Sequence, residues 1–300
     1  MTLPSKTSAS GFELPVLGFG TWGMGGYFEL DPANDDERDV AAIRYALSVG
    51  INHIDTAELY AAGHSEEIVA RAVEGIPRAS FTVATKAWRH LHSYSVLKET
   101  CRASLQRLKL DYVDLYYLHA ANHDIPFEET ARALKELRAE GLIRHYGLCN
   151  FGPDSMKRLQ DLLDAPIAVN QSHYSLVYRE VEMAELVKHC QEVGALFAAW
   201  RPLMWRYHTR TNQPAACAWQ TGVYPILDGA AVELGKTNSQ VALNWLISQP
   251  NVVALVKSSN PQHIDEMLGA VGWEMPAEMI ERFRADFPDQ RYVSDAVPLG

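Results

Sequence analysis

The chain has 300 residues, of which 47% are hydrophobic, and 27 basic and 37 acidic residues give a formal net charge of −10 at pH 7. This acidic balance disfavours binding to a phosphate backbone, so nucleic acid is not an expected partner. No apolar run approaches the roughly 18 residues of a membrane span, and residues 1–11 lack the apolar stretch of a signal peptide. The four cysteines have no spacing typical of a metal or redox motif. We therefore expect a cytoplasmic protein with no membrane partner and no bound metal.

The first segment of the chain is polar and then briefly apolar, which predicts a short hairpin within residues 1–16 and a strand at 17–20. The glycines at positions 18, 20 and 23 match the pattern G-x-G-x-x-G. A dinucleotide-binding fingerprint requires a helix to begin at the third glycine, whereas here the chain continues into a polar loop. The pattern is therefore not interpreted as a Rossmann motif.

Strands and helices alternate along the rest of the chain. The first helix is expected to begin after Asn34, with Glu37 in a capping-box relation, and to end at Gly50. The strands that follow are expected at 51–55, 80–86, 113–119, 143–150, 167–171, 195–200 and 252–257. The remaining helices are expected near 65–74, 93–108, 127–140, 153–163, 180–193, 238–248, 261–269 and 276–286.

Repeated strand–helix units of this length predict a parallel sheet, and the strand at 17–20 brings the number of strands to eight. No break in composition divides the chain. We therefore expect an α/β protein with a single (β/α)8 TIM barrel domain over residues 1–300, a short N-terminal hairpin and extra C-terminal helices.

The residues at the predicted strand ends are mostly polar or aromatic, which a purely structural rim would not require. They are Trp22, Asp55, Lys86, His119, Asn150, Gln171, Trp200 and Lys257. Because the active site of such a barrel lies at the C-terminal ends of its strands, these residues predict one shared site.

Four of the residues in this region can perform proton chemistry together. A tyrosine has a pKa near 10, and a nearby ammonium lowers that pKa because it stabilises the phenolate. Lys86 would supply this charge to Tyr60, Asp55 would hold Lys86 in place, and His119 would hydrogen-bond a substrate oxygen. The arrangement suits the reduction of a carbonyl, for which a cofactor must supply the hydride.

Simpler explanations exist for some of these residues when they are taken singly. Asp55 alone would be a helix cap, Lys86 a surface charge and Tyr60 a packing residue. The pair His90 and His92 could suggest a metal site, but it precedes a helix and lacks complementary ligands at other strand ends, so we expect loop residues. Three further aromatic residues in the long loop 201–222 either close over substrate or pack the loop onto the barrel: Trp205, Tyr207 and Trp219.

In the order and spacing of its motifs, the chain resembles the aldo-keto reductases. The matching stretches span residues 17 to 267 and read GINHIDTAELY, AGHSEE, TVATKAW, DLYYLH, GLCNF, VNQSHY, AAWRPL, VALNWLI and VKSSNP. The resemblance implies an NADP(H)-dependent (β/α)8 barrel that reduces a small-molecule aldehyde or ketone, or oxidises the corresponding alcohol or sugar. It also implies a catalytic tetrad of Asp55, Tyr60, Lys86 and His119, with Tyr60 as general acid and base.

The resemblance further implies a set of cofactor contacts. Asn150 and Gln171 would hold the nicotinamide carboxamide, Trp200 would stack on the nicotinamide ring, and Lys257 and Ser258 would contact the 2′-phosphate. Additional cofactor contacts are expected from Gly20, Thr21, Trp22, Asp55, Arg201, Pro202, Leu203, Ser259, Asn260, His263 and Glu266. The substrate is expected to lie against Trp22, Trp88 and His119.

Four positions depart from the family pattern. Cys149 replaces the usual serine before Asn150, so one carboxamide contact is expected to be weaker. Arg201 replaces the usual serine after the stacking aromatic residue, and we infer from its position, not from the family pattern, a contact with the pyrophosphate. His263 replaces an arginine that commonly grips the 2′-phosphate, and a neutral histidine lacks the bidentate fork of arginine. The preference for NADPH is therefore expected to be modest, with NADH as a second candidate cofactor. Ala120 replaces a common tryptophan and predicts room for bulkier substrates.

The resemblance also supplies two default expectations. The protein is expected to be a monomer, and the alternative to an enzyme is a cofactor-binding regulatory subunit without turnover.

Overall fold

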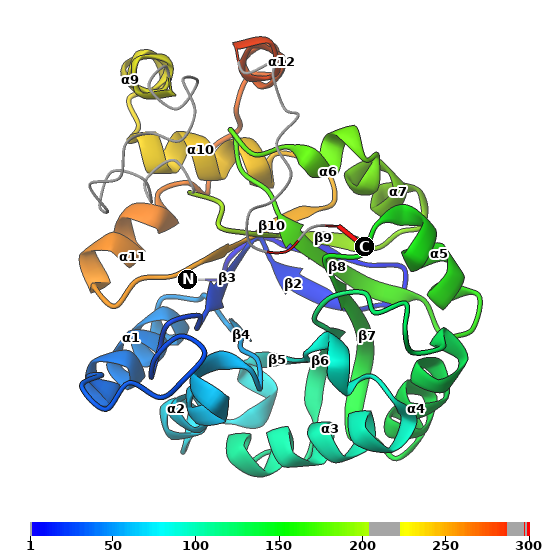
Figure 1. The fold of residues 1–300 in the computed structure, drawn as a ribbon. Helices are drawn as coiled ribbons and strands as arrows, with labels where there is room; N and C mark the ends of the chain where they lie inside the picture. The colour runs from blue at the N-terminus through cyan, green and yellow to red at the C-terminus, as the bar shows by residue number, and fades with distance from the viewer. Residues whose placement is uncertain (1, 204–222, 287–296, 298) are drawn as a thin grey trace.

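The structure is a computed structural model that describes residues 2–203, 223–286, 297 and 299–300. Eight parallel strands close into a barrel in the order β10-β3-β4-β5-β6-β7-β8-β9, and helices surround it (Figure 1). The barrel strands are β3 (Leu17–Gly20), β4 (His53–Asp55), β5 (Thr82–Ala87), β6 (Val113–Leu118), β7 (Ile143–Cys149), β8 (Ile167–His173), β9 (Leu196–Trp200) and β10 (Val252–Val256). The predicted (β/α)8 fold is confirmed.

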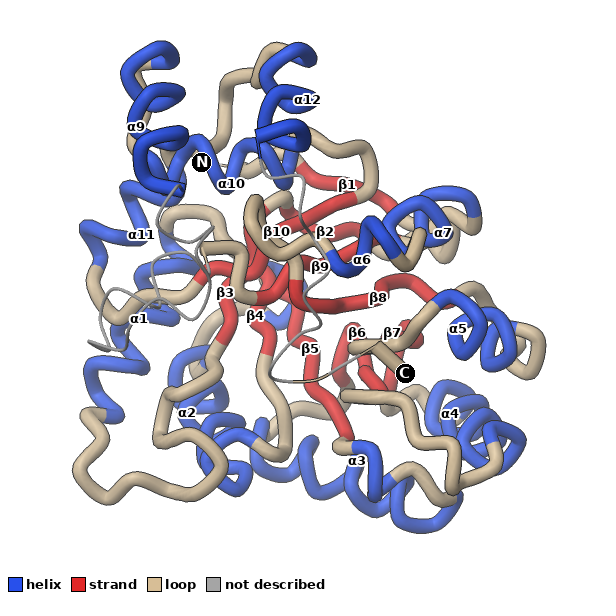
Figure 2. The backbone as a smooth tube through the Cα atoms, turned by 45° about the horizontal axis from the view of Figure 1, so that its top comes forward, coloured by secondary structure: helices blue, strands red, loops and turns tan. Residues whose placement is uncertain are grey.

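The α-helices of the described residues cover the outside of the barrel (Figure 2). They are α1 (Asp36–Ser48), α2 (His64–Val73), α3 (Tyr94–Leu108), α4 (Phe127–Ala139), α5 (Pro153–Gln160), α6 (Glu180–Met183), α7 (Leu186–Glu192), α9 (Val223–Leu234), α10 (Asn238–Ile247), α11 (Pro261–Leu268) and α12 (Ala277–Asp286). Short 3-10 turns lie at η1 (Tyr60–Gly63), η2 (Arg78–Ser80) and η3 (Arg89–Leu91). None of the helices in the described part of the chain is both long and apolar enough to cross a bilayer.

The predicted N-terminal hairpin is present, and it closes one end of the barrel. Its antiparallel strands are β1 (Ser5–Thr7) and β2 (Glu13–Pro15). Phe12 and Leu14 pack in one cluster with buried residues of the barrel strands, including Leu115 and Tyr117. A second, larger cluster lies between strands and helices and contains the neighbouring Tyr116. Adjacent residues of β6 thus face the barrel interior and the helices in turn, as the period of a strand requires.

Three details differ from the sequence expectations. The first helix begins one residue later than expected, because the side chain of Asp35 accepts from the Arg38 N–H and serves as the N-cap. The helix expected at 180–193 is divided into α6 and α7 by Glu185, whose φ is +56°. Helix α9 was not predicted, since Pro225 and Gly229 are poor helix formers. The aromatic residues Trp205, Tyr207 and Trp219 lie outside the described residues.

Candidate active site

Three of the four predicted tetrad residues meet directly at the C-terminal end of the barrel. Asp55 ends β4 and Lys86 lies near the end of the neighbouring β5, so parallel pairing brings the two side chains to one edge. The Nζ atom of Lys86 lies 2.5 Å from Asp55 Oδ1 and 3.3 Å from Tyr60 Oη. It also donates to the carbonyl oxygen of Thr56 at 2.8 Å. One buried ammonium therefore links the carboxylate to the phenol.

The fourth residue, His119, follows β6 and lies beside this group. Its ring centroid is 5.8 Å from that of Tyr60 and 5.1 Å from that of Trp88, both in edge-to-face arrangements. Burial and the charge of Lys86 hold the pKa of His119 well below its ordinary value, so the imidazole is neutral. Within the described part of the chain, its buried Nδ1 has no hydrogen-bond partner.

The electrostatics of Tyr60 differ from the sequence expectation in direction. Burial raises the pKa of the phenol to about 12, although the adjacent ammonium of Lys86 acts to lower it. Burial of the anion outweighs the attraction, because phenolate loses its hydration in the interior. Burial also disfavours the charged form of Lys86, but the attraction and hydrogen bond of Asp55, together with the effects of Tyr60 and Cys149, raise the pKa of Lys86. The site thus holds a protonated phenol against an ammonium.

The backbone that carries Tyr60 is unusual. Ala61 and Ala62 have φ values of +52° and +53°, and Gly63 follows with a φ of +94°. Residues with a Cβ adopt this left-handed region rarely, and such outliers cluster at functional sites. The N–H groups of Ala61 and Ala62 donate to the carbonyl oxygens of Tyr27 and Phe28, at 2.7 and 2.9 Å.

A second carboxylate, Glu58, joins the loop of Tyr60 to the end of β5. Its Oε1 accepts from the backbone N–H of Trp88 at 2.8 Å, and its own N–H lies 3.4 Å from the carbonyl oxygen of Lys86. Burial raises the pKa of Glu58. Sequence reasoning missed Glu58 and the left-handed turn. The position of Glu58 between Asp55 and Tyr60 could have identified it, whereas alanine carries no signal for a left-handed backbone.

The residues predicted to hold the nicotinamide lie at the adjoining strand ends. Gln171 Nε2 donates to the second carboxylate oxygen of Asp55 at 2.8 Å. Asn150 has a left-handed backbone, donates to the carbonyl oxygen of His119 at 3.0 Å and accepts from Trp200 Nε1 at 3.2 Å. The indole of Trp200 stacks on His173 with ring centroids 4.5 Å apart. Asn150, Gln171 and Trp200 therefore form one connected network with the tetrad.

Cys149 and Ala120, two of the residues that depart from the family pattern, are both buried beside this network. The Sγ of Cys149 lies 3.8 Å from Gln171 Oε1, a long contact for this donor. Ala120 is 3% exposed, and the room for bulkier substrates that it implies stays a prediction.

The residues predicted to hold the phosphates lie on the loop after β10 and at the start of α11. Ser258 Oγ accepts from the Asn260 N–H at 3.0 Å and lies 3.4 Å from His263 Nδ1. Asn260 in turn caps α11 through the N–H of Gln262. Lys257 is exposed at the beginning of this loop. An exposed cation beside hydroxyl groups and a helix N-terminus suits an anionic group, so these residues fit a phosphate.

The other predicted cofactor residues lie on both sides of these groups. Ser259 Oγ donates to Asp39 at 3.3 Å, and Glu266 accepts from Thr237 Oγ1 at 3.0 Å. Buried Thr21 accepts from Ser65 Oγ at 2.9 Å. Gly20 ends β3, Trp22 contacts the ring of Tyr60, and three more follow β9 directly: Arg201, Pro202 and Leu203.

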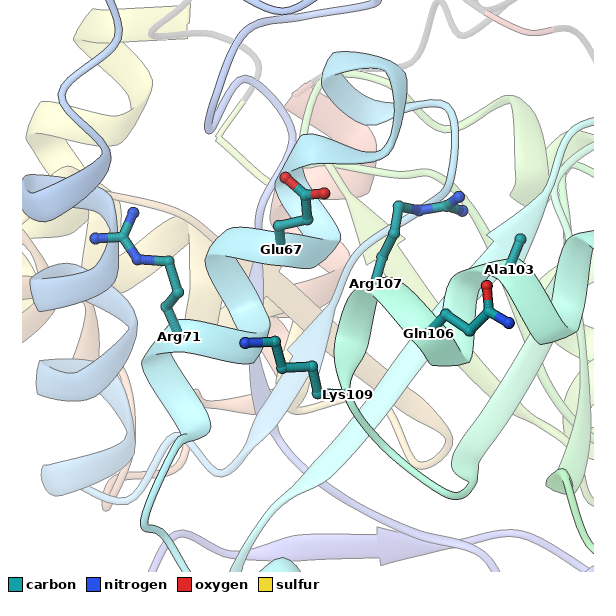
Figure 3. Close-up of a pocket in the computed structure, with 6 residues that line it drawn as sticks. All are labelled: Glu67, Arg71, Ala103, Gln106, Arg107 and Lys109. Atoms are coloured by element: carbon teal, nitrogen blue, oxygen red, sulfur yellow. The ribbon is translucent and has the colours of Figure 1, made fainter.

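Two features that could suggest other chemistry do not join this site. The buried ring of His92 contacts the carbonyl oxygen of Ala87 at 3.0 Å, and no cluster of three metal-ligating side chains occurs in the ranges that the structure describes. A cavity of about 460 Å³ lies on the outer helices, away from the strand ends (Figure 3). It is lined by Glu67, Arg71, Ala103, Gln106, Arg107 and Lys109.

The charges around this outer cavity are largely paired. Arg107 lies 2.7 Å from buried Glu66, and Arg71 binds Asp36 and Glu37. The charged side chains around the cavity are therefore explained by structural ion pairs between the outer helices.

The chain is thus a (β/α)8 barrel protein with a buried lysine, aspartate, tyrosine and histidine at the ends of its strands. The model of the aldo/keto reductase family matches residues 16–285. The chain belongs to the aldo-keto reductase family and is thereby an oxidoreductase.

Three relatives illustrate the similarity. An aldo-keto reductase of Mycolicibacterium smegmatis is 32% identical, over 92% of this chain and 91% of its own length. A methylglyoxal reductase of Escherichia coli is 31% identical, over 92% of each. The crystal structure of an aldo-keto reductase from Klebsiella pneumoniae in complex with NADPH is 30% identical and has a TM-score of 0.83, covering 97% of this chain and 98% of that one.

Proposed function

We propose that this protein is an NADP(H)-dependent carbonyl reductase in which Tyr60 is the general acid for reduction and the general base for the reverse reaction. The observation that carries the proposal is the position of Lys86 Nζ between Asp55 Oδ1 and Tyr60 Oη inside a buried site. The NADPH complex of the Klebsiella relative and the carbonyl substrate named for the Escherichia relative support the choice of cofactor and reaction.

The raised pKa of Tyr60 fits the role of an acid, because a donor must hold its proton until the substrate needs it. NADPH supplies the hydride when it is bound. As negative charge develops on the substrate oxygen, Tyr60 Oη donates its proton there, and the phenolate that remains faces the ammonium of Lys86. Asp55 and the Thr56 carbonyl hold that ammonium in place.

His119 has a different role in this proposal. Its neutral imidazole donates a hydrogen bond to the substrate oxygen and orients the carbonyl toward Tyr60. A neutral ring suits this task, because a second cation beside Lys86 would be repelled in the buried site. The ring of Trp88 fixes one side of the imidazole by an edge-to-face contact.

We assign cofactor binding to residues at the ends of the barrel strands and on α11. Asn150 and Gln171 would hold the carboxamide, Trp200 would stack on the nicotinamide ring, and Arg201, Pro202 and Leu203 would contact the pyrophosphate. The other contacts would come from Gly20, Thr21 and Trp22 at the end of β3, and, to the adenosine phosphate, from Lys257, Ser258, Ser259, Asn260, His263 and Glu266. Lys257 and the N-terminus of α11 supply the positive potential that the 2′-phosphate requires.

Turnover tests the proposal directly. Purified protein with NADPH and a panel of aldehydes and ketones should oxidise the cofactor, and Tyr60→Phe should abolish reduction while cofactor binding is kept. Full activity of Tyr60→Phe would refute the mechanism. Cofactor binding without turnover of any carbonyl would favour the second candidate, a cofactor-binding regulatory subunit. We further propose that residues 1–300 act as one barrel domain and as a monomer.

A further inference from the structure

The loop between β3 and α1 carries an unusual number of exposed apolar side chains. It is the dark blue segment between these elements in Figure 1. Six large hydrophobic side chains are exposed among the described residues, and three of them lie here: Tyr27, Phe28 and Leu30. Phe28 is 61% exposed. Exposed apolar groups gathered on one loop are typical of a surface that contacts an apolar ligand.

This loop is closed at its base by defined contacts. The N–H of Asp31 donates to the carbonyl oxygen of Gly25 at 2.9 Å, and Gly26 forms a bridge with Leu30. A Cβ atom on Gly26 would lie 2.2 Å from the carbonyl oxygen of Glu29, so the loop closes only with glycine there. The exposed rings are therefore held in place before any ligand arrives.

The tip of the loop is attached to the backbone that carries Tyr60. The left-handed residues Ala61 and Ala62 direct their N–H groups at the carbonyl oxygens of Tyr27 and Phe28. An ordinary right-handed turn after Tyr60 would aim these donors elsewhere. The strained turn therefore fixes the position of the loop relative to the reacting phenol.

A chain of ring contacts connects Phe28 to the same phenol. The ring of Trp22 lies 4.8 Å from that of Tyr60 and 5.0 Å from that of Phe28, edge-to-face in both cases. Phe28 is thus one ring removed from the proton donor. A substrate whose carbonyl oxygen reaches Tyr60 and whose far end extends along Trp22 arrives at Phe28.

We infer that Phe28 is a specificity-determining residue and that the protein selects aldehydes and ketones that carry a large apolar group, such as an aromatic ring. The inference rests on the proposed carbonyl reduction at Tyr60. The apolar group of the substrate covers Trp22 and Phe28 and removes both rings from water. The left-handed turn at Ala61 and Ala62 acts as a positioning element for this surface.

Selectivity kinetics test the inference. Phe28→Ala is expected to lower the ratio of kcat/KM for 2-naphthaldehyde to kcat/KM for propanal by about 10-fold, through loss of apolar contact area in the transition state. Phe28→Leu keeps much of that area and should recover most of the ratio. The matched control is Val232→Ala, which removes an 84% exposed apolar side chain on α9 and should leave the ratio unchanged.

The outcomes separate the two proposals. A ratio that does not move in Phe28→Ala, or that falls equally in Val232→Ala, overturns the role of Phe28 while the proposed reaction stands. Absence of turnover by the unaltered protein with every carbonyl overturns the proposed reaction and the specificity inference with it. A selective loss in Phe28→Ala that Phe28→Leu recovers supports both.

Discussion

Replacing Lys86 by methionine removes the one buried charge that links Asp55 to Tyr60. The separation of 3.3 Å between Lys86 Nζ and Tyr60 Oη corresponds to about 5 kcal/mol of stabilisation of the phenolate at an effective dielectric constant of about 20. If proton transfer is about half complete in the transition state, roughly 2.5 kcal/mol is lost, so kcat should fall about 100-fold. The measurement is NADPH oxidation with an aldehyde substrate.

The same substitution should also destabilise the fold. Asp55 would be left in the interior with Gln171 as its remaining side-chain partner, and a buried charge stripped of its counter-ion costs about 3–5 kcal/mol. Urea unfolding of Lys86→Met measures this cost. The double variant Lys86→Met/Asp55→Asn removes both charges and should recover most of the stability but none of the activity.

This double variant separates catalysis from folding. A variant that regained stability and also regained full turnover would show that Lys86 serves only to neutralise Asp55. The reasoning about phenolate stabilisation would then be wrong. A variant that is stable and slow supports a direct effect of the ammonium on Tyr60.

Three further predictions follow from particular contacts. Glu58→Leu removes the acceptor of the Trp88 N–H and should lower kcat about 10-fold, whereas Glu58→Gln keeps an oxygen there and should retain activity; equal losses would contradict a positioning role. Burial lowers the pKa of His92 to about 4, so the folded state resists a proton that the unfolded chain accepts near pH 6.5, and stability should fall as pH drops from about 6.5 to about 4. Urea unfolding across this range should show a shallower slope in His92→Gln. His263→Arg should raise the NADPH-to-NADH ratio of kcat/KM about 10-fold, since arginine offers a bidentate fork; an unchanged ratio would place the 2′-phosphate elsewhere.

The sequence predicted the barrel well because each strand carries a short apolar run that ends on a polar or aromatic residue. It failed where a local backbone conformation is set by tertiary contacts. Helices α6 and α7 are separated at Glu185, which has a left-handed backbone. The sequence has no glycine at this position that would indicate such a conformation. Helix α9 contains Pro225 and Gly229, and both lower the helix propensity on which the prediction rests.

In the candidate site, too, the positions of the residues could be predicted from the sequence, whereas one of their pKa shifts could not. Asp55, Lys86 and His119 occupy or follow the ends of neighbouring strands, so topology alone brings them together. The net direction of the pKa shift of Tyr60 depends on how burial compares with the charge of Lys86, and that comparison needs the depth of the site. The sequence motif identifies the groups that are present, but it does not indicate whether burial or the charge of Lys86 has the larger effect on the pKa of Tyr60.

The surroundings of Tyr60 combine two arrangements that are unfavourable for folding on their own. Lys86 and Asp55 are charged and buried, and three consecutive residues after Tyr60 are left-handed, two of them alanines. A fold selected only for stability would place apolar residues at the first and glycine at the second. Both arrangements act on the same phenol: the charge of Lys86, which Asp55 holds in place, favours its anion, and the turn fixes the apolar loop beside it. Tyr116 and Tyr117 are more deeply buried than Tyr60, and neither is followed by such a turn. The coincidence of the two arrangements at Tyr60 supports our proposal that this tyrosine is the reacting group.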